Sequence, residues 1–194
     1  MANNELATTK TAIDRLNRSA EFSDLDALVK AKTRRSLLLV DASGSMADTI
    51  RKTGERKIDA LRKVVDGLRE THPVPVAAFG CYGEPVTVVD RVPEPQGGTP
   101  LDLAIDFGRE QGATHLIVVT DGEPNDEGAA FAAARAFGGQ IDVFYVGNGN
   151  DSGSRFAQQL ARMTGGTCGV TDLGETKQLQ SRIAGLLGSA NDLI

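Results

Sequence analysis

Residues 37–45 read LLLVDASGS, and this stretch indicates the fold class. Its first four residues form a short apolar run, which is typical of a strand buried on both faces of a sheet. The polar turn DASGS ends that strand, and apolar residues then recur at helical spacing at Ile58, Leu61, Val65 and Leu68. A buried strand, a polar turn and an amphipathic helix in this order predict the first unit of an α/β domain.

The same alternation of strands and helices continues along the chain. Further strands are expected at residues 76–79, 85–89, 115–120, 141–146 and 167–170, and further helices at residues 101–108, 129–136, 156–163 and 178–187. Only residues 80–84 separate the second strand from the third, which is too short for a parallel crossover, so these two strands should form a hairpin with an antiparallel edge strand. The sequence therefore predicts a doubly wound, mostly parallel α/β sheet with helices on both faces.

Length and composition are consistent with one such domain plus an arm. The chain has 194 residues, of which 40% are apolar and 24% charged, and this mixture is enough for one sizeable core. Residues 1–34 are polar with weak helical spacing, which predicts a short helical arm or, equally, a partly disordered one. The main domain is assigned to residues 35–188, and residues 189–194 form a C-terminal tail.

Charge and cysteine content exclude several classes of partner and location. The net charge is −5 and no Lys/Arg-rich run occurs, so neither nucleic acid nor an anionic membrane is expected as a partner. The longest apolar stretches are too short to span a bilayer, and the N-terminus lacks the pattern of a secretory signal. Cys81 and Cys168 do not make a disulfide framework, so they are expected to be packing residues in a cytoplasmic protein.

Three polar segments are placed where a sheet of this kind binds ligands, beyond the carboxyl ends of its strands. Asp41, Ser43 and Ser45 follow the first strand, Asp121 follows the strand at residues 115–120, and Thr99 opens a helix after two glycines. All five side chains offer oxygen, which suits Mg²⁺, Mn²⁺ or Ca²⁺ and argues against zinc or copper. Because Mg²⁺ readily keeps water, an open position is expected, which a partner's Asp or Glu carboxylate could fill.

The DxSxS turn at residues 41–45, together with Thr99 and Asp121, resembles the metal-ion-dependent adhesion site (MIDAS) of von Willebrand factor type A (VWA) domains. The resemblance extends over roughly residues 35–188 and implies a six-stranded sheet of order 3-2-1-4-5-6. It also implies protein–protein recognition through the metal, with Asp41, Ser43 and Ser45 as ligands and with Thr99 and Asp121 binding directly or through water. Intracellular prokaryotic members often resemble partners of AAA+ ATPases or of stress-response systems, so an adaptor role in a complex with an AAA+ ATPase is one interpretation of the resemblance. The oligomeric state is left open.

Simpler interpretations exist for several of these residues. Asp41, Ser43 and Ser45 are also typical of turns and helix caps, and Thr99 is a plausible N-cap with Pro100 at the first helical position. Two further sets of polar residues lie near the predicted site. Glu123 and Asp126 fit the acidic start of a helix, while Asp151 and Ser152 fit a solvated loop.

Two alternative functions remain beside the binding module. A Mg²⁺-dependent phosphatase would share an Asp after the first strand, but the DxDx(T/V) pattern of aspartate-nucleophile phosphatases needs a second Asp as general acid where this chain has Ser43. No lysine is expected in the turns at the site, no Walker A pattern occurs, and His115 begins its strand at the opposite end of the sheet. A metal-free scaffold domain is the other alternative. The sequence favours a non-enzymatic, metal-dependent binding module.

Overall fold

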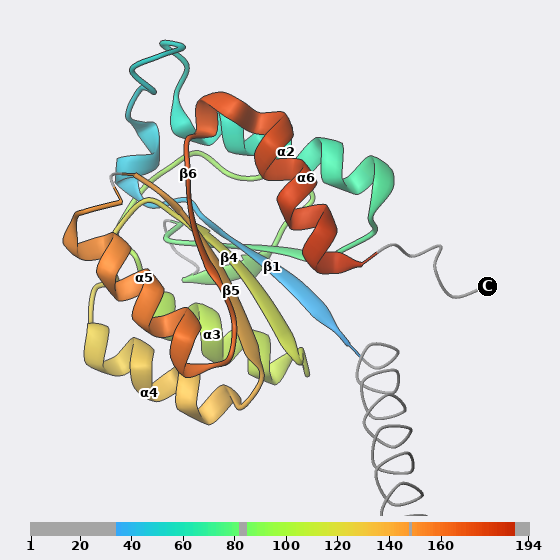
Figure 1. The fold of residues 1–194 in the computed structure, drawn as a ribbon, viewed down its shortest axis with the longest axis vertical. Coiled ribbons are helices and arrows are strands. Elements are labelled where there is room, and N and C mark those ends of the chain that lie inside the picture. Colours follow the sequence, from blue (N-terminus) through green and yellow to red (C-terminus); the bar gives the residue numbers. More distant parts are fainter. Residues whose placement is uncertain (1–33, 82–84, 148, 189–194) are drawn as a thin grey trace, which may run out of the picture. The chain divides into compact units, whose positions relative to one another are not determined.

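The computed structural model describes residues 34–81, 85–147 and 149–188 (Figure 1). Apart from Arg34, the predicted arm at residues 1–34 lies outside this range, as does the tail at residues 189–194, so both stay predictions. The described elements, in chain order, are β1 Ser36–Asp41, the 3₁₀ helix η1 Gly44–Ala47, α2 Lys57–Thr71, β2 Val76–Phe79, β3 Val86–Val88, α3 Leu101–Glu110, β4 His115–Thr120, α4 Glu127–Phe137, β5 Gln140–Val146, α5 Ser152–Met163, β6 Cys168–Thr171, the 3₁₀ helix η2 Leu173–Glu175 and α6 Thr176–Leu187.

The described strands form one six-stranded sheet in the order β3-β2-β1-β4-β5-β6. Every neighbouring pair is parallel except β2 and β3, which pair antiparallel with Ala78 opposite Thr87. The predicted fold class, strand order and antiparallel edge strand are therefore confirmed.

Helices cover both faces of the sheet, with α2 and α6 on one face and α3, α4 and α5 on the other (Figure 1). Successive residues of β1 supply both layers, because side chains alternate across a strand. Leu37 and Leu39 pack on the α3–α5 side, whereas Leu38 and Val40 pack on the α2–α6 side. This double burial explains the continuous apolar run, and each fully buried leucine contributes roughly 1.5–3 kcal/mol.

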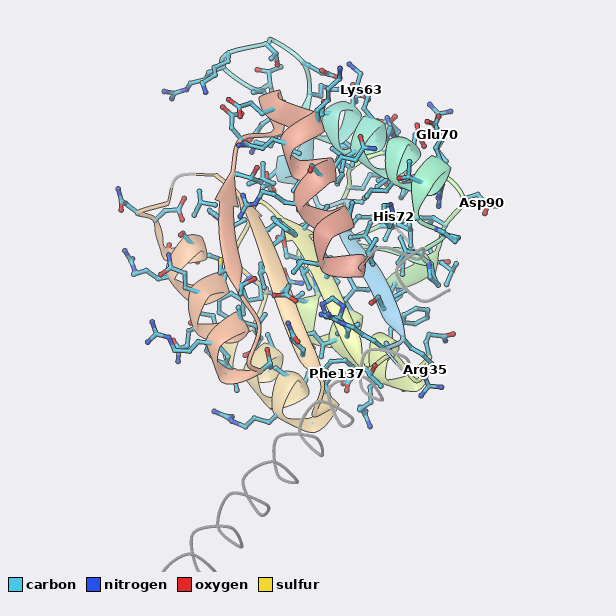
Figure 2. The ribbon with its side chains drawn as sticks, turned by 45° about the vertical axis from the view of Figure 1, so that its right-hand side comes forward. Arg35, Lys63, Glu70, His72, Asp90 and Phe137 are labelled. Atoms are coloured by element: carbon cyan, nitrogen blue, oxygen red, sulfur yellow. The ribbon has the colours of Figure 1, made fainter. Side chains whose placement is uncertain are left out.

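The register of the parallel strands aligns their carboxyl ends at one edge of the sheet. Val40 of β1 pairs with Val119 of β4, so Asp41 and the end of β4 lie at the same level. Strands begin at the other edge, where Ser36 pairs with His115. Figure 2 shows Arg35, which precedes β1, and Phe137, which ends α4, at this same end of the domain. His115 is therefore far from Asp121, as predicted.

Two further predictions concern the cysteines and membrane spans. Cys81 and Cys168 are both unpaired, and β1, β4 and β5 separate the strands nearest to them. In the parts of the chain that the structure describes, no helix is both long and apolar enough to cross a bilayer.

Candidate metal centre

Asp41 is the innermost acidic residue of the candidate centre. It ends β1 with no exposed surface, and its Oδ1 accepts a hydrogen bond from the Ser43 backbone N–H at 2.7 Å. Its Oδ2 accepts one from the Thr120 hydroxyl at 2.5 Å. Burial raises the pKa of Asp41 to about 6, although the hydrogen bonds from Thr120 and Ser43 act in the opposite direction. A nearby cation would offset this cost of keeping the carboxylate ionised.

Two serine hydroxyls connect the turn after β1 to the turn after β4. The Ser43 and Ser45 hydroxyl oxygens lie 3.2 Å apart, and the Ser45 hydroxyl donates to Asp121 Oδ1 at 2.7 Å. The Asp121 side chain is buried, with none of its surface exposed. Segments 76 residues apart in the sequence thus meet at one point, and the two predicted acidic residues lie in the same cluster as the predicted serines.

Thr99 lies beside this cluster, but it does not cap α3. Pro100 occupies the N-cap position and no side chain caps the helix, so the predicted capping role of Thr99 is wrong. The turn after β4 holds the threonine instead, because Thr99 N–H donates to Asn125 Oδ1 at 2.9 Å and Asn125 N–H donates to the Thr99 carbonyl at 2.9 Å. A Cβ atom placed on Gly122 would lie 3.5 Å from Thr99 Oγ1 and 3.9 Å from Ser45 Oγ. Both hydroxyls therefore flank the residue that follows Asp121.

Glycines let the loops of the centre approach closely. Gly44 N–H donates to the Gly97 carbonyl at 3.0 Å, which joins the turn after β1 to the loop that carries Thr99. Gly80 has φ +82°, and a Cβ atom there would lie 2.5 Å from the Gly98 carbonyl oxygen and 3.0 Å from the Ser43 nitrogen. Only glycine fits such a position, so the loop after β2 is held against the centre.

Lys57 is a residue of the centre that the sequence did not reveal. Its Nζ donates to Asp121 Oδ2 at 2.6 Å, although Lys57 begins α2 and so lies outside the turns in which no lysine was expected. The cause is the path of residues 48–56, where the bridge between Thr49 and Arg56 brings the start of α2 back over the site. A lysine in the first turn of a helix interacts unfavourably with the helix dipole. This unfavourable position was the only hint in the sequence that Lys57 pairs with an acidic residue elsewhere.

The acidic residues around the centre have structural roles. Asp126 caps α4 by accepting from Ala129 N–H at 2.8 Å, as the acidic helix start suggested. Asp151 caps α5 by accepting from Ser154 N–H at 2.8 Å and also accepts from the Tyr145 hydroxyl at 3.0 Å. The interpretation of Asp151 as part of a solvated loop is therefore wrong. Glu123 accepts a hydrogen bond from the Ser152 hydroxyl.

The chemistry of these residues fits a hard divalent cation. Asp41 and Asp121 supply two carboxylates, and Ser43, Ser45 and Thr99 supply three hydroxyls, so every donor is oxygen. Within the described residues no group of three or more His, Cys, Asp or Glu side chains could hold a metal, and the candidate centre therefore depends on its hydroxyls. The Lys57 ammonium lies 2.6 Å from Asp121 Oδ2, so a metal bound at that oxygen would have to share it or take it over.

Comparisons with known proteins support the fold alone. No protein-family model matches this chain, and no curated protein sequence does either. Among solved structures the chain is similar to a protein described as von Willebrand factor type A from Catenulispora acidiphila, with a TM-score of 0.60 and 18% sequence identity. The similarity covers 80% of this chain and 43% of that one. The fold is thus that of a VWA domain, and this chain matches less than half of its structural neighbour's length.

Proposed function

We propose that this chain is a divalent-metal-dependent protein-binding module with a site of the MIDAS type. Asp41, Ser43, Ser45, Thr99 and Asp121 would hold one Mg²⁺ ion, for which Mn²⁺ or Ca²⁺ could substitute, and the partner would contribute an Asp or Glu side chain. The observation that carries the proposal is the chain of hydrogen-bonding contacts from Ser43 through Ser45 to Asp121, beside the buried Asp41.

The charges and lone pairs of these residues are suited to that task. Asp41 and Asp121 together supply two carboxylates, which would balance a divalent cation once Lys57 no longer pairs with Asp121. Each oxygen of the Asp41 carboxylate accepts one hydrogen bond and keeps a free lone pair. The bound cation would supply a hard Lewis acid to which a partner's carboxylate oxygen binds.

Lys57 gives some support to the phosphatase alternative, because such enzymes use cationic side chains to neutralise phosphate. Two features of the site argue for the binding module instead. The position of the general acid is occupied by Ser43, which cannot serve near neutral pH. Asp41, the residue in the nucleophile's place, has no exposed surface and both of its oxygens accept hydrogen bonds. Turnover of an aryl phosphate in Mg²⁺ that is lost in Asp41→Asn would favour the enzyme.

A pull-down in Mg²⁺ and in EDTA tests the proposed function. The native chain is expected to capture a partner in Mg²⁺ and to release it in EDTA, and Asp41→Asn is expected to capture nothing in either buffer. Asp106→Asn is the matched control, because Asp106 pairs with Arg109 on the surface of α3 and should leave capture unchanged. The adaptor role that the VWA resemblance implies predicts an AAA+ ATPase among the captured proteins. Equal capture in EDTA, or by Asp41→Asn, would contradict the proposal.

A further inference from the structure

Lys57 lies between the candidate metal centre and a hollow on the same edge of the sheet. Its Nζ is 2.6 Å from Asp121 Oδ2, 3.5 Å from the Ser45 carbonyl oxygen and 3.7 Å from Asp48 Oδ2. The lysine side chain is 21% exposed, whereas that of Asp121 is fully buried. Since Ser45 donates to Asp121 Oδ1, the ammonium occupies the other oxygen of the carboxylate that a metal would need.

An ammonium in this position opposes a second cation. Two positive charges a few ångströms apart repel each other, and the buried setting of Asp121 screens this repulsion less than bulk water would. A metal at Asp121 must therefore either displace the lysine from its carboxylate or bear the repulsion from it, and both lower the affinity. We infer that Lys57 is a built-in competitor of the metal, which occupies Asp121 in the metal-free protein and sets the metal concentration at which the site fills. This inference rests on the proposed function.

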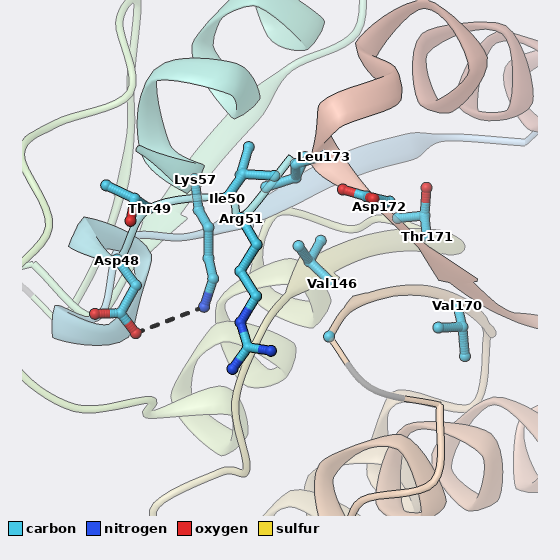
Figure 3. A pocket seen from close by; sticks show the side chains of 11 residues that line it. Asp48, Thr49, Ile50, Arg51, Lys57, Val146, Val170, Thr171, Asp172 and Leu173 are labelled. Carbon is cyan, nitrogen blue, oxygen red and sulfur yellow. Dashed lines mark ion pairs between the residues drawn. The ribbon is translucent and has the colours of Figure 1, made fainter. Parts of the chain in front are cut away.

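The hollow gives the lysine a place to go. It has a volume of about 580 Å³, and its walls include Asp48, Ile50, Arg51, Val146, Thr171 and Leu173. Figure 3 shows the Lys57 side chain extending into this space, with its ammonium directed at Asp48. The Asp48 side chain is 72% exposed and so offers a hydrated carboxylate within reach of a small side-chain movement. A side-chain movement of Lys57 would therefore let it exchange Asp121 for Asp48 as the metal enters.

Isothermal titration with Mn²⁺, comparing the native chain with Lys57→Met, tests the inference. Methionine keeps the unbranched apolar stem but removes the charge, so Lys57→Met is expected to bind Mn²⁺ at least about tenfold more tightly. In EDTA the same variant should melt at a lower temperature than the native chain, because Asp121 loses its partner. The control is Lys63→Met, which removes the same charge from an exposed lysine of α2 that pairs with Glu55. This variant should bind Mn²⁺ with the affinity of the native chain.

The outcomes separate this inference from the proposed function. Native protein that binds Mn²⁺, with Lys57→Met binding equally or more weakly, would overturn the inference and leave the binding module intact. Mn²⁺ binding by neither protein would refute both. If Lys57→Met does not fold, Lys57→Gln provides the same comparison, because its amide can still donate a hydrogen bond to Asp121 without carrying a charge.

Discussion

Asp41→Asn is expected to abolish the rise in melting temperature that Mg²⁺ or Mn²⁺ gives the native chain. A ligand present at about 100 times its Kd stabilises a protein by about 2.7 kcal/mol, which for a domain of this size corresponds to roughly 5–10 °C. Without the Asp41 carboxylate only Asp121 remains to balance the cation, and Lys57 already neutralises that residue. Differential scanning calorimetry in metal and in EDTA measures the shift.

Without metal, Asp41→Asn should remain folded. A missing rise in melting temperature would then reflect lost metal binding and not lost structure. Burial raises the pKa of Asp41 to about 6, so its contribution to stability is present in acid and is lost as the pH rises through about 6. At pH 7.5 the ionised carboxylate costs stability, and an uncharged asparagine avoids that cost. In EDTA we therefore expect Asp41→Asn to melt at or above the native temperature. The account fails if Asp41→Asn keeps the full metal shift that the native chain and the Asp106→Asn control show.

Asp142→Ala is expected to cause the largest loss of stability, at the opposite edge of the sheet. His115 Nε2 lies 2.7 Å from Asp142 Oδ2, both side chains are 1% exposed, and His115 Nδ1 is 2.9 Å from the Ser36 hydroxyl. Thr167 donates to Asp142 Oδ1 through both its backbone N–H and its hydroxyl, each at 2.7 Å. Asp142→Ala leaves these donors without an acceptor, and each one that stays buried and unsatisfied costs about 1–3 kcal/mol. Urea unfolding measures this loss.

The loss in Asp142→Ala should depend on pH. Burial alone would raise the pKa of Asp142, but the hydrogen bonds from His115 and Thr167 outweigh it and hold the pKa at about 2, below the ordinary 3.8. Its stabilising contribution is therefore complete above the ordinary value and is lost as the pH falls toward 2. The difference between native and Asp142→Ala should be smaller at pH 3 than at pH 7.

Two comparisons establish what the Asp142→Ala result means. Asp66→Ala, on the exposed face of α2, should change the free energy of unfolding by less than about 0.5 kcal/mol. Asp142→Ala should also keep the metal-induced rise in melting temperature, because Asp142 and the metal centre lie at opposite edges of the sheet. A loss of stability no larger than that of Asp66→Ala would show that the buried pair does not hold this edge together.

The fold was predictable because its signals are local. The run at residues 37–40 indicates a strand buried on both faces, and residues 80–84 are too few for a parallel crossover, so the antiparallel edge followed. The positions of Asp41 and Asp121 were predictable for the same reason, since residues that directly follow parallel strands meet at one edge. The metal itself stays a prediction, because the structure brings these oxygens together without testing what they bind.

Contacts that depend on loop paths and distant partners were not predictable. Lys57 and Asp121 are 64 residues apart, and their contact requires residues 48–56 to fold back over the site. Thr120 and Asn125 position Asp41 and Thr99 through side-chain hydrogen bonds between distant segments. A sequence pattern shows which residues could donate or accept, but the partner is fixed only when the tertiary packing is known.

A crystal grown in saturating Mn²⁺ and measured at the manganese absorption edge tests the central claim most directly. The account predicts one anomalous peak bounded by the oxygens of Asp41, Ser43, Ser45, Thr99 and Asp121, with the Lys57 ammonium moved away from Asp121. A map with no peak at this position, and with Lys57 still paired with Asp121, would contradict it.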